Sequence, residues 1–310
     1  YLGSALGGLA FAEEQHGAFL QNGIRSVSNI LALTVFGSAS SCNVAIDMGL
    51  FGPNQTNANS CASGAVAVGE ATRLIQLGEA RVMLAGGVDA PLAPLIFGAF
   101  DVIRAISSNS NDDPSHASRP FDAHRDGFVM SEGAGVLVLE EYEHARARGA
   151  TMYAEVLGYA TTTDAHHMTA PRPDAAQAIR AMRRALATAR LEPSEIEYIS
   201  AHASATPLND KTETVAIKEV FGERAYKIPV SGTKAMHGHA LGASGAFELA
   251  ISCLALQHDY LPPTINLQHP EPACDLDYIP HTGRHKRVNT VLSNSFGFGG
   301  INACLILGRV

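Results

Sequence analysis

Short apolar runs alternate along the chain with longer stretches of helical spacing. Residues 81–87 and 196–200 are brief and apolar, which predicts buried strands. Residues 173–189 repeat their apolar positions every three to four residues, which predicts an amphipathic helix. Because strands and helices alternate in this way throughout, the pattern predicts an α/β protein with largely parallel sheets.

The pattern restarts near residue 150. Residues 234–257 repeat the character of the segment around Cys61, with a polar approach, a glycine and alanine entry and then an apolar helix. This recurrence predicts two related halves, residues 1–150 and 151–310. A polar stretch at residues 107–126 predicts a long surface loop, and the chain closes with two predicted strands around a glycine-rich turn.

Composition excludes several classes of protein. Hydrophobic residues make up 46% of the 310 and charged residues 17%, which excludes a disordered chain. The net charge of −8 disfavours a nucleic-acid binder, and no apolar run approaches the ~18 residues of a membrane span. The scattered cysteines predict neither a disulfide framework nor a zinc site, which fits the cytoplasm, and no metal site is expected. They are Cys42, Cys61, Cys253, Cys274 and Cys304.

Cys61 is a candidate nucleophile. It lies between a predicted strand at residues 55–60 and a helix of small residues. A helix N-terminus offers free N–H groups and a positive dipole end, which predicts a lowered pKa for the thiol and a thiolate. For a single cysteine, a buried structural role is the alternative.

Further candidates follow predicted strands. His202 precedes a hydroxyl-rich turn, and His239 precedes a helix with Lys234 five residues upstream. Ligands of parallel sheets bind at the carboxyl ends of strands, which favours a site there. Glycines around Phe298 leave backbone N–H groups free to bind an oxyanion. Ordinary loop histidines and an ordinary glycine hairpin are the alternatives.

Eight segments together resemble the elongating β-ketoacyl-acyl carrier protein synthases of the thiolase-like superfamily, in family order and over essentially the whole chain. They are GSALGGL (3–9), NSCASGA (59–65), SRPFDAHRDGFVMSEGAGVLVLE (118–140), DAHHMTAP (164–171), HASATPLND (202–210), TKAMHGHALGASGA (233–246), PPTINL (262–267) and NSFGFGGINA (294–303).

The resemblance implies a fold and a reaction. The fold is a pair of pseudo-repeated βαβαβαββ halves in an αβαβα sandwich, with the first half incomplete because family members extend further at the N-terminus. The reaction is a decarboxylating Claisen condensation between an acyl chain on cysteine and malonyl-acyl carrier protein. It elongates the acyl chain by two carbons, as in fatty-acid synthesis.

Residue roles also follow from the resemblance. Cys61 is the nucleophile, and His202 and His239 promote decarboxylation as neutral imidazoles. Lys234 discourages their protonation, and Glu213 matches the acidic partner of that lysine. The amides of Cys61 and Phe298 form the oxyanion hole, and the Phe298 ring gates the acyl pocket.

The implied substrate contacts surround this set. Ser204, Thr206 and Thr169 match positions that bind the phosphopantetheine arm, Arg104 matches a carrier-docking residue, and Leu6 and Phe296 are placed with the substrate. No cofactor is permanently bound, because phosphopantetheine arrives on the acyl carrier protein. The family forms homodimers through the strand expected at residues 55–60, with Leu31 and Leu33 as contributors to the interface or the acyl pocket.

Some residues depart from the family pattern. Ala203 and Ala205 replace a glycine and a hydroxyl residue, and His237 stands where threonine is common, so it competes for the role given to His239. Three alternatives stay open: a non-catalytic partner subunit that sets chain length, a ketosynthase of a polyketide or specialised-lipid pathway, and a thiolase or acyltransferase that does not decarboxylate. Cys61 argues against the first, and the lack of a cysteine in the C-terminal glycine loop argues against the last.

Overall fold

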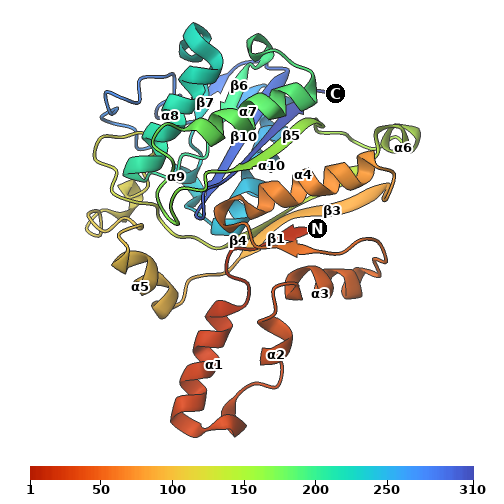
Figure 1. Cartoon of the computed structure of the whole chain (residues 1–310), viewed down its shortest axis with the longest axis vertical. Helices are drawn as coiled ribbons and strands as arrows, with labels where there is room; N and C mark the ends of the chain where they lie inside the picture. The colour runs from red at the N-terminus through yellow and green to blue at the C-terminus, as the bar shows by residue number, and fades with distance from the viewer.

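Two sheets form the framework of the computed structural model, which describes residues 1–310 (Figure 1). The first has the strand order β2-β1-β3-β4 and the second the order β5-β11-β10-β6-β7, and β8 pairs with β9. The strands are β1 (Leu2–Gly3), β2 (Thr56–Asn57), β3 (Val82–Asp89), β4 (Gly133–Glu140), β5 (Glu155–Thr163), β6 (Tyr198–Ser200), β7 (Val230–Ser231), β8 (Tyr260–Leu261), β9 (Arg284–His285), β10 (Thr290–Gly297) and β11 (Ile301–Gly308).

Both sheets are mixed, so the prediction of largely parallel sheets was wrong. β1 is parallel to β2 and β3, whereas β3 and β4 are antiparallel. In the second sheet β6 is parallel to β7 and β10, but β11 is antiparallel to both of its neighbours. The tight glycine turn between β10 and β11 makes them a hairpin, and a hairpin pairs its strands antiparallel.

The helices complete a layered sandwich. α4 (Ser63–Gln76) and α10 (Ser244–His258) lie between the two sheets, and α7 (Ala176–Ala189) and α8 (Pro207–Phe221) cover the outer face of the second (Figure 1). The remaining helices are α1 (Leu9–Asn22), α2 (Leu31–Thr34), α3 (Ala39–Met48), α5 (Pro94–Val102), α6 (Tyr142–Ala147) and α9 (Lys234–His237), with short 3-10 turns η1 (Ile24–Ser26), η2 (Ser60–Ala62), η3 (Pro114–His116), η4 (Pro193–Glu195), η5 (Gly222–Lys227) and η6 (Leu241–Ala243).

The first sheet has one strand fewer than the second. In the second sheet β11 pairs with β5 on one side and β10 on the other, but β4 pairs only with β3. Val136 and Val138, which alternate with less exposed residues along β4, are 50% and 62% exposed on one face of the sheet. The first sheet therefore lacks the strand that β5 supplies to the second.

The two halves repeat one local structure where they meet. Ser60 and Leu241 both have positive φ (53° and 45°), and each begins a 3-10 turn that leads into α4 or α10. Backbones approach closely at this junction, because a Cβ on Gly64 would lie 2.7 Å from the Gly242 carbonyl oxygen. The repeat places Cys61 and Gly242 at equivalent positions of the two halves.

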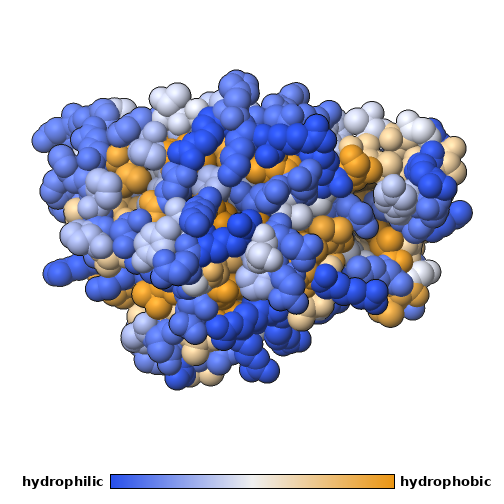
Figure 2. Space-filling model, turned by 90° about the horizontal axis from the view of Figure 1, so that it is seen from above, coloured by the Kyte–Doolittle hydropathy of each residue, from blue (hydrophilic) through white to orange (hydrophobic).

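Apolar surface is distributed unevenly. α1 and α2 project from the body of the molecule (Figure 1), and hydrophobic side chains such as Leu20, Ile24 and Leu33 are exposed on this arm. The view from above shows separate hydrophobic patches among hydrophilic residues (Figure 2). No helix combines the length and apolar character that a membrane crossing requires.

Candidate active site

Cys61 lies in the 3-10 turn η2, immediately before α4, and is buried. The Ser60 hydroxyl lies 3.8 Å from its Sγ, and the Phe298 backbone N–H also donates toward the sulfur. Burial nevertheless raises the pKa of the Cys61 thiol, although these donors and the Lys234 charge oppose the shift. The prediction of a lowered pKa was wrong, because the cost of desolvating a thiolate exceeds the help from the helix end.

His202 follows β6 and is buried beside Lys234. Its Nδ1 lies 3.4 Å from the Lys234 Nζ, which also donates to the His202 carbonyl oxygen at 2.5 Å. An ammonium group only donates, so Nδ1 is the acceptor and a neutral His202 carries its proton on Nε2. Burial and, second to it, the Lys234 charge lower the pKa of His202 well below its ordinary value, the direction predicted for the lysine.

His239 is the second imidazole at the site. Its ring lies 5.4 Å from that of His202, centre to centre, and its Nδ1 contacts the Ser244 hydroxyl at 2.8 Å. Burial and Lys234 lower the pKa of His239 as well. His237 contacts Thr233 at 3.1 Å and does not line the cavity, so position favours His239 over its competitor.

The acidic partner of Lys234 is Glu248 on α10, not Glu213. The Lys234 ammonium and the Glu248 carboxylate form a buried ion pair. Glu213 instead accepts hydrogen bonds from the backbone N–H groups of His202 and Ala203, each at 2.9 Å. The prediction of a Lys234–Glu213 pair was wrong because α8 holds Glu213 under the N–H side of the His202 loop, whereas Lys234 reaches the carbonyl side.

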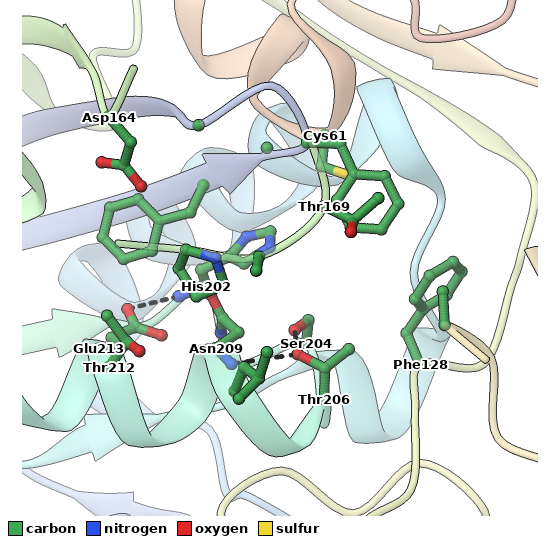
Figure 3. A pocket seen from close by; sticks show the side chains of 18 of the residues that line it. Cys61, Phe128, Asp164, Thr169, His202, Ser204, Thr206, Asn209, Thr212 and Glu213 are labelled. Carbon is green, nitrogen blue, oxygen red and sulfur yellow. Dashed lines mark hydrogen bonds between the residues drawn. The ribbon is translucent and has the colours of Figure 1, made fainter. Parts of the chain in front are cut away.

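A cavity of about 300 Å³ joins the candidates (Figure 3). Lys234 does not line this cavity but lies against His202, and Leu6 packs in an adjoining apolar cluster. The other predicted site residues line it: Cys61, Arg104, Thr169, His202, Ser204, Thr206, Glu213, His239, Phe296 and Phe298.

The hydroxyl residues are presented by a strained loop. Ala203 and Ala205 have φ of 44° and 63°, a region that costs an L-residue ~1–2 kcal/mol. Between and after them, the hydroxyls of Ser204 and Thr206 lie 3.0 Å apart (Figure 3). Thr206 also caps α8 by accepting from the Asn209 N–H at 3.3 Å. The alternation of backbone conformation therefore places two polar groups on the cavity wall.

An apolar cluster adjoins the thiol. Leu6 and Phe298 pack with Cys61, Ile96 and other residues of the cluster. The Phe298 ring lies 6.2 Å from that of Phe100 on α5, centre to centre. The space next to the nucleophile is thus bounded by hydrocarbon side chains.

Sequence reasoning missed three acids that organise the site. Asp89 accepts from the N–H groups of Ala5, Leu6 and Gly242, and so joins the two halves beside Cys61. Asp164 lines the cavity and accepts from the side chain of Asn302 at 2.8 Å. The third acid is Glu248, the partner of Lys234. Two of these residues carried a signal in the sequence: Asp89 is an acid at the end of a strand, and Glu248 is the one acid in the apolar stretch of α10.

All five cysteines are free. No three His, Cys, Asp or Glu side chains are grouped as metal ligands.

Comparison with known proteins identifies the family. The beta-ketoacyl synthase N-terminal domain matches residues 1–145, and the beta-ketoacyl synthase C-terminal domain matches residues 153–268. A 3-oxoacyl-[acyl-carrier-protein] synthase 2 of Synechocystis is 48% identical over 304 residues, or 98% of this chain and 73% of the relative. The chain belongs to the β-ketoacyl synthase family. It is a ketosynthase, and therefore an acyltransferase.

Relatives of this ketosynthase come from two kinds of pathway. A 3-oxoacyl-[acyl-carrier-protein] synthase 2 of Coxiella burnetii is 44% identical over the whole chain and 74% of the relative. The ketoacyl synthase alpha subunit of the tetracenomycin polyketide synthase of Streptomyces glaucescens is 50% identical over 86% of the chain and 62% of the relative.

Solved structures confirm the thiolase-like fold. A type II PKS ketosynthase, solved with its acyl-carrier protein and bound to the hexaketide, has a TM-score of 0.97 at 39% identity over the whole chain and 77% of that protein. A beta-ketoacyl synthase from Burkholderia phymatum has a TM-score of 0.90 at 39% identity, over the whole chain and 75% of that protein.

Proposed function

We propose that Cys61 carries the acyl chain, and that His202 and His239 drive decarboxylation of a malonyl thioester beside it. The observation that carries this proposal is that all three side chains line one cavity. The elongating condensation of the family needs a nucleophile and two neutral hydrogen-bond donors at one place. The lowered pKa of both imidazoles keeps them neutral near pH 7.

The first step transfers the acyl group. The Cys61 sulfur attacks the carbonyl carbon of the incoming thioester, the new S–C bond forms, and the bond to the carrier sulfur breaks. The thiol proton leaves with the departing carrier thiolate. The N–H groups of Cys61 and Phe298 stabilise the oxyanion that develops during the attack.

The second step forms the carbon–carbon bond. The malonyl thioester loses carbon dioxide, and its thioester oxygen becomes an enolate that accepts hydrogen bonds from the Nε2 atoms of His202 and His239. The enolate carbon attacks the acyl carbonyl, the bond to Cys61 breaks, and the Cys61 thiolate takes up a proton from solvent. The product is a β-ketoacyl thioester on the carrier.

The partner of this reaction is an acyl carrier protein with its phosphopantetheine arm. Ser204 and Thr206 offer hydroxyls to the amides of that arm from one wall, and Thr169 lines the same cavity. Arg104 is exposed, and its cation suits an acidic carrier. The related type II PKS ketosynthase was solved in complex with its acyl-carrier protein, which supports this assignment.

The ketosynthase assembles as a homodimer. β2 is the outer strand of the first sheet, and its free edge suits pairing with a second copy. Exposed apolar side chains on the adjoining segments, including Leu33, Ile46 and Phe51, support burial of this region. Sedimentation analysis tests the assembly: a monomer at micromolar concentration would contradict it.

A specialised pathway is the second candidate for the same chemistry. This candidate is supported by the similarity of the chain to a polyketide ketoacyl synthase as well as to synthase 2 enzymes. A fatty-acid enzyme accepts saturated acyl chains, whereas a polyketide enzyme extends chains that keep their keto groups. The product distinguishes the two, because only the second accumulates poly-β-keto chains without reduction.

One experiment tests the chemistry. The protein is mixed with acyl-carrier and malonyl-carrier thioesters, and carbon dioxide, β-ketoacyl product and intact protein mass are followed. We expect an acyl adduct that Cys61→Ala abolishes and that Cys253→Ala, a control on α10, retains. An adduct that persists in Cys61→Ala would overturn the nucleophile. An adduct formed without carbon dioxide release would overturn the roles of the histidines.

A further inference from the structure

A chain of hydrogen bonds runs from β11 to the His202 loop. The Cys304 thiol donates to Asn294 Oδ1 at 3.3 Å, and Asn294 Nδ2 donates to Glu213 Oε1 at 3.0 Å. Cys304 and Asn294 are direct partners in the antiparallel register of β11 and β10. All three side chains are almost completely buried.

As a carboxylate, Glu213 accepts three hydrogen bonds and donates none. One oxygen accepts from the His202 N–H and from Asn294, and the other accepts from the Ala203 N–H. These bonds hold Ala203 in its unfavourable positive-φ conformation. Because Lys234 binds the carbonyl oxygen of His202, both ends of that residue's backbone are held, and the direction of its imidazole is fixed.

Cys304 decides which way the Asn294 amide faces. A side-chain amide can rotate by 180°, which exchanges its NH₂ and its oxygen. The Cys304 thiol is the donor that satisfies Oδ1, so NH₂ points to Glu213. Without that donor the amide can present its oxygen to the Glu213 carboxylate, which repels it and loosens the His202 loop.

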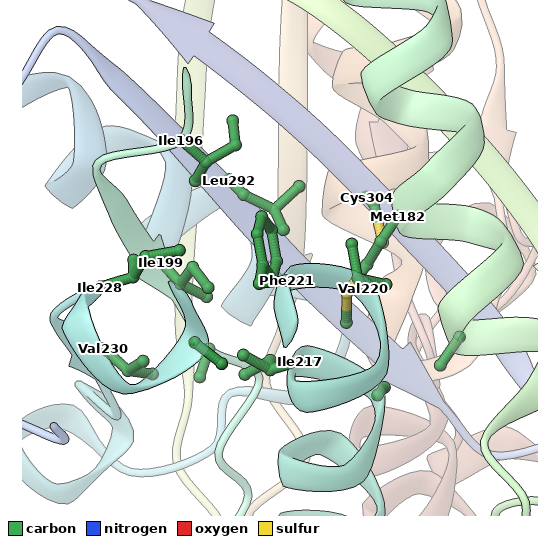
Figure 4. Packing of buried hydrophobic residues seen from close by; sticks show 14 of the residues in the cluster. Met182, Ile196, Ile199, Ile217, Val220, Phe221, Ile228, Val230, Leu292 and Cys304 are labelled. Atoms are coloured by element: carbon green, nitrogen blue, oxygen red, sulfur yellow. The ribbon is translucent and has the colours of Figure 1, made fainter. Parts of the chain in front are cut away.

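We propose that Cys304 and Asn294 are positioning residues for His202, acting through Glu213. Cys304 lies beside Met182 and Val220 in the hydrophobic core (Figure 4). An apolar side chain would satisfy packing there, so what the thiol adds is its hydrogen bond to Asn294. The inference rests on the proposed role of His202 in decarboxylation. Acylation of Cys61 does not require His202, so acyl transfer can be measured as a step that the inference expects to stay unchanged.

The test uses Cys304→Ala, Cys304→Val and Cys304→Ser. Valine keeps the volume without a donor, and serine restores one. Cys274→Ala is the matched control, since Cys274 is buried in the same core cluster but lies outside the chain of bonds. Carbon dioxide release from malonyl-carrier thioester and acyl transfer to Cys61 are measured separately, together with the melting temperature.

We expect both donor-free variants to slow decarboxylation by about tenfold, the size of one lost buried hydrogen bond, with acyl transfer changed less than about twofold. Cys304→Ser recovers most of the rate, and Cys274→Ala changes neither step. Normal decarboxylation in Cys304→Val overturns the inference. So does an equal loss of both steps with a lowered melting temperature, which indicates a structural role. A wild-type protein that does not decarboxylate would instead overturn the proposed function.

Discussion

Lys234 contacts His202 twice, through the imidazole Nδ1 and through the backbone carbonyl oxygen. The same ammonium pairs with Glu248, so a charge pair is buried directly behind a neutral imidazole. The lysine thus fixes the tautomer of His202 and lowers the pKa of both histidines.

Lys234→Met removes this charge. The pKa of His202 and His239 then rises. Both imidazoles therefore become protonated at a higher pH than in the wild type, and the neutral form that the reaction needs is lost earlier as pH falls. Burial still lowers both pKa values, so we expect the acidic limb of the pH–rate profile to move to higher pH, and decarboxylation at neutral pH to fall about tenfold because Nδ1 of His202 loses its donor. The measurement is carbon dioxide release between pH 5 and 8.

Lys218→Met is the control, since Lys218 forms an ion pair with Asp275 away from the cavity. It leaves the pH–rate profile unchanged. A Lys234→Met enzyme whose acidic limb stays in place would contradict the electrostatic role of the lysine.

Ala203→Gly relieves the backbone of the His202 loop. Alanine at φ 44° is strained by ~1–2 kcal/mol, which glycine relieves. The greater freedom of glycine in the unfolded chain destabilises the folded state by ~0.5–1 kcal/mol. Deleting the fully buried methyl group costs a further ~0.8 kcal/mol, so these terms nearly cancel and we expect little net change in urea unfolding. Ala201→Gly, two residues earlier and equally buried, is not at positive φ and is expected to destabilise. Equal destabilisation by both variants would show that Ala203 is not strained.

Local sequence patterns predicted much of the fold. The helix at α7 and the strands at β3 and β6 follow from periodicity, because their apolar faces pack in the same way whatever lies beyond them. Strand direction did not follow, since β4 and β11 run antiparallel to their neighbours through connections that apolar patterning does not encode. The projecting arm of α1 and α2 was not foreseen either.

The candidate site was predicted by residue but not by contact. Cys61, His202 and His239 come together as the family resemblance implies. Which acid reaches Lys234 depends on where α8 and α10 lie on the two faces of the second sheet, so sequence could not choose between Glu213 and Glu248. The pKa of Cys61 likewise depends on burial, which the position of a helix end does not reveal.

Gly242→Ala tests the close junction between the halves. A Cβ there would lie 2.6 Å from both the Ala5 nitrogen and an Asp89 oxygen, and its own N–H donates to that carboxylate at 2.6 Å. Backbone and a buried acid cannot move aside cheaply, so we expect a loss of about 2–3 kcal/mol in urea unfolding. Acylation of Cys61 slows as well, because Asp89 also holds the Leu6 loop. Gly17→Ala on α1 meets nothing within 4 Å and is the control. Equal stability of the two variants would show that the junction is not tightly packed.

Glu213 links stability to pH in a direction opposite to most acids. Burial raises its pKa from 4.5 to about 7, although three N–H donors favour the carboxylate. Between those values the folded protein keeps a proton that the unfolded chain has lost. The contribution of this group to the free energy of unfolding is therefore full below pH 4.5 and is lost as pH rises to about 7.

Glu213→Gln removes the carboxyl group that binds this proton in the folded protein. We expect urea unfolding between pH 4.5 and 7 to show one fewer proton bound on folding than in the wild type, so the free energy of unfolding falls less steeply with pH. Glu219→Gln, on the same helix with a side chain 60% exposed, leaves the slope unchanged.

The rate of decarboxylation depends on pH in the opposite direction, because the carboxylate form of Glu213 holds the His202 loop. We expect this rate to rise through pH 7 in the wild type and to rise less in Glu213→Gln. An unchanged stability slope in Glu213→Gln would show that Glu213 is already ionised at pH 4.5 and that its N–H donors outweigh its burial.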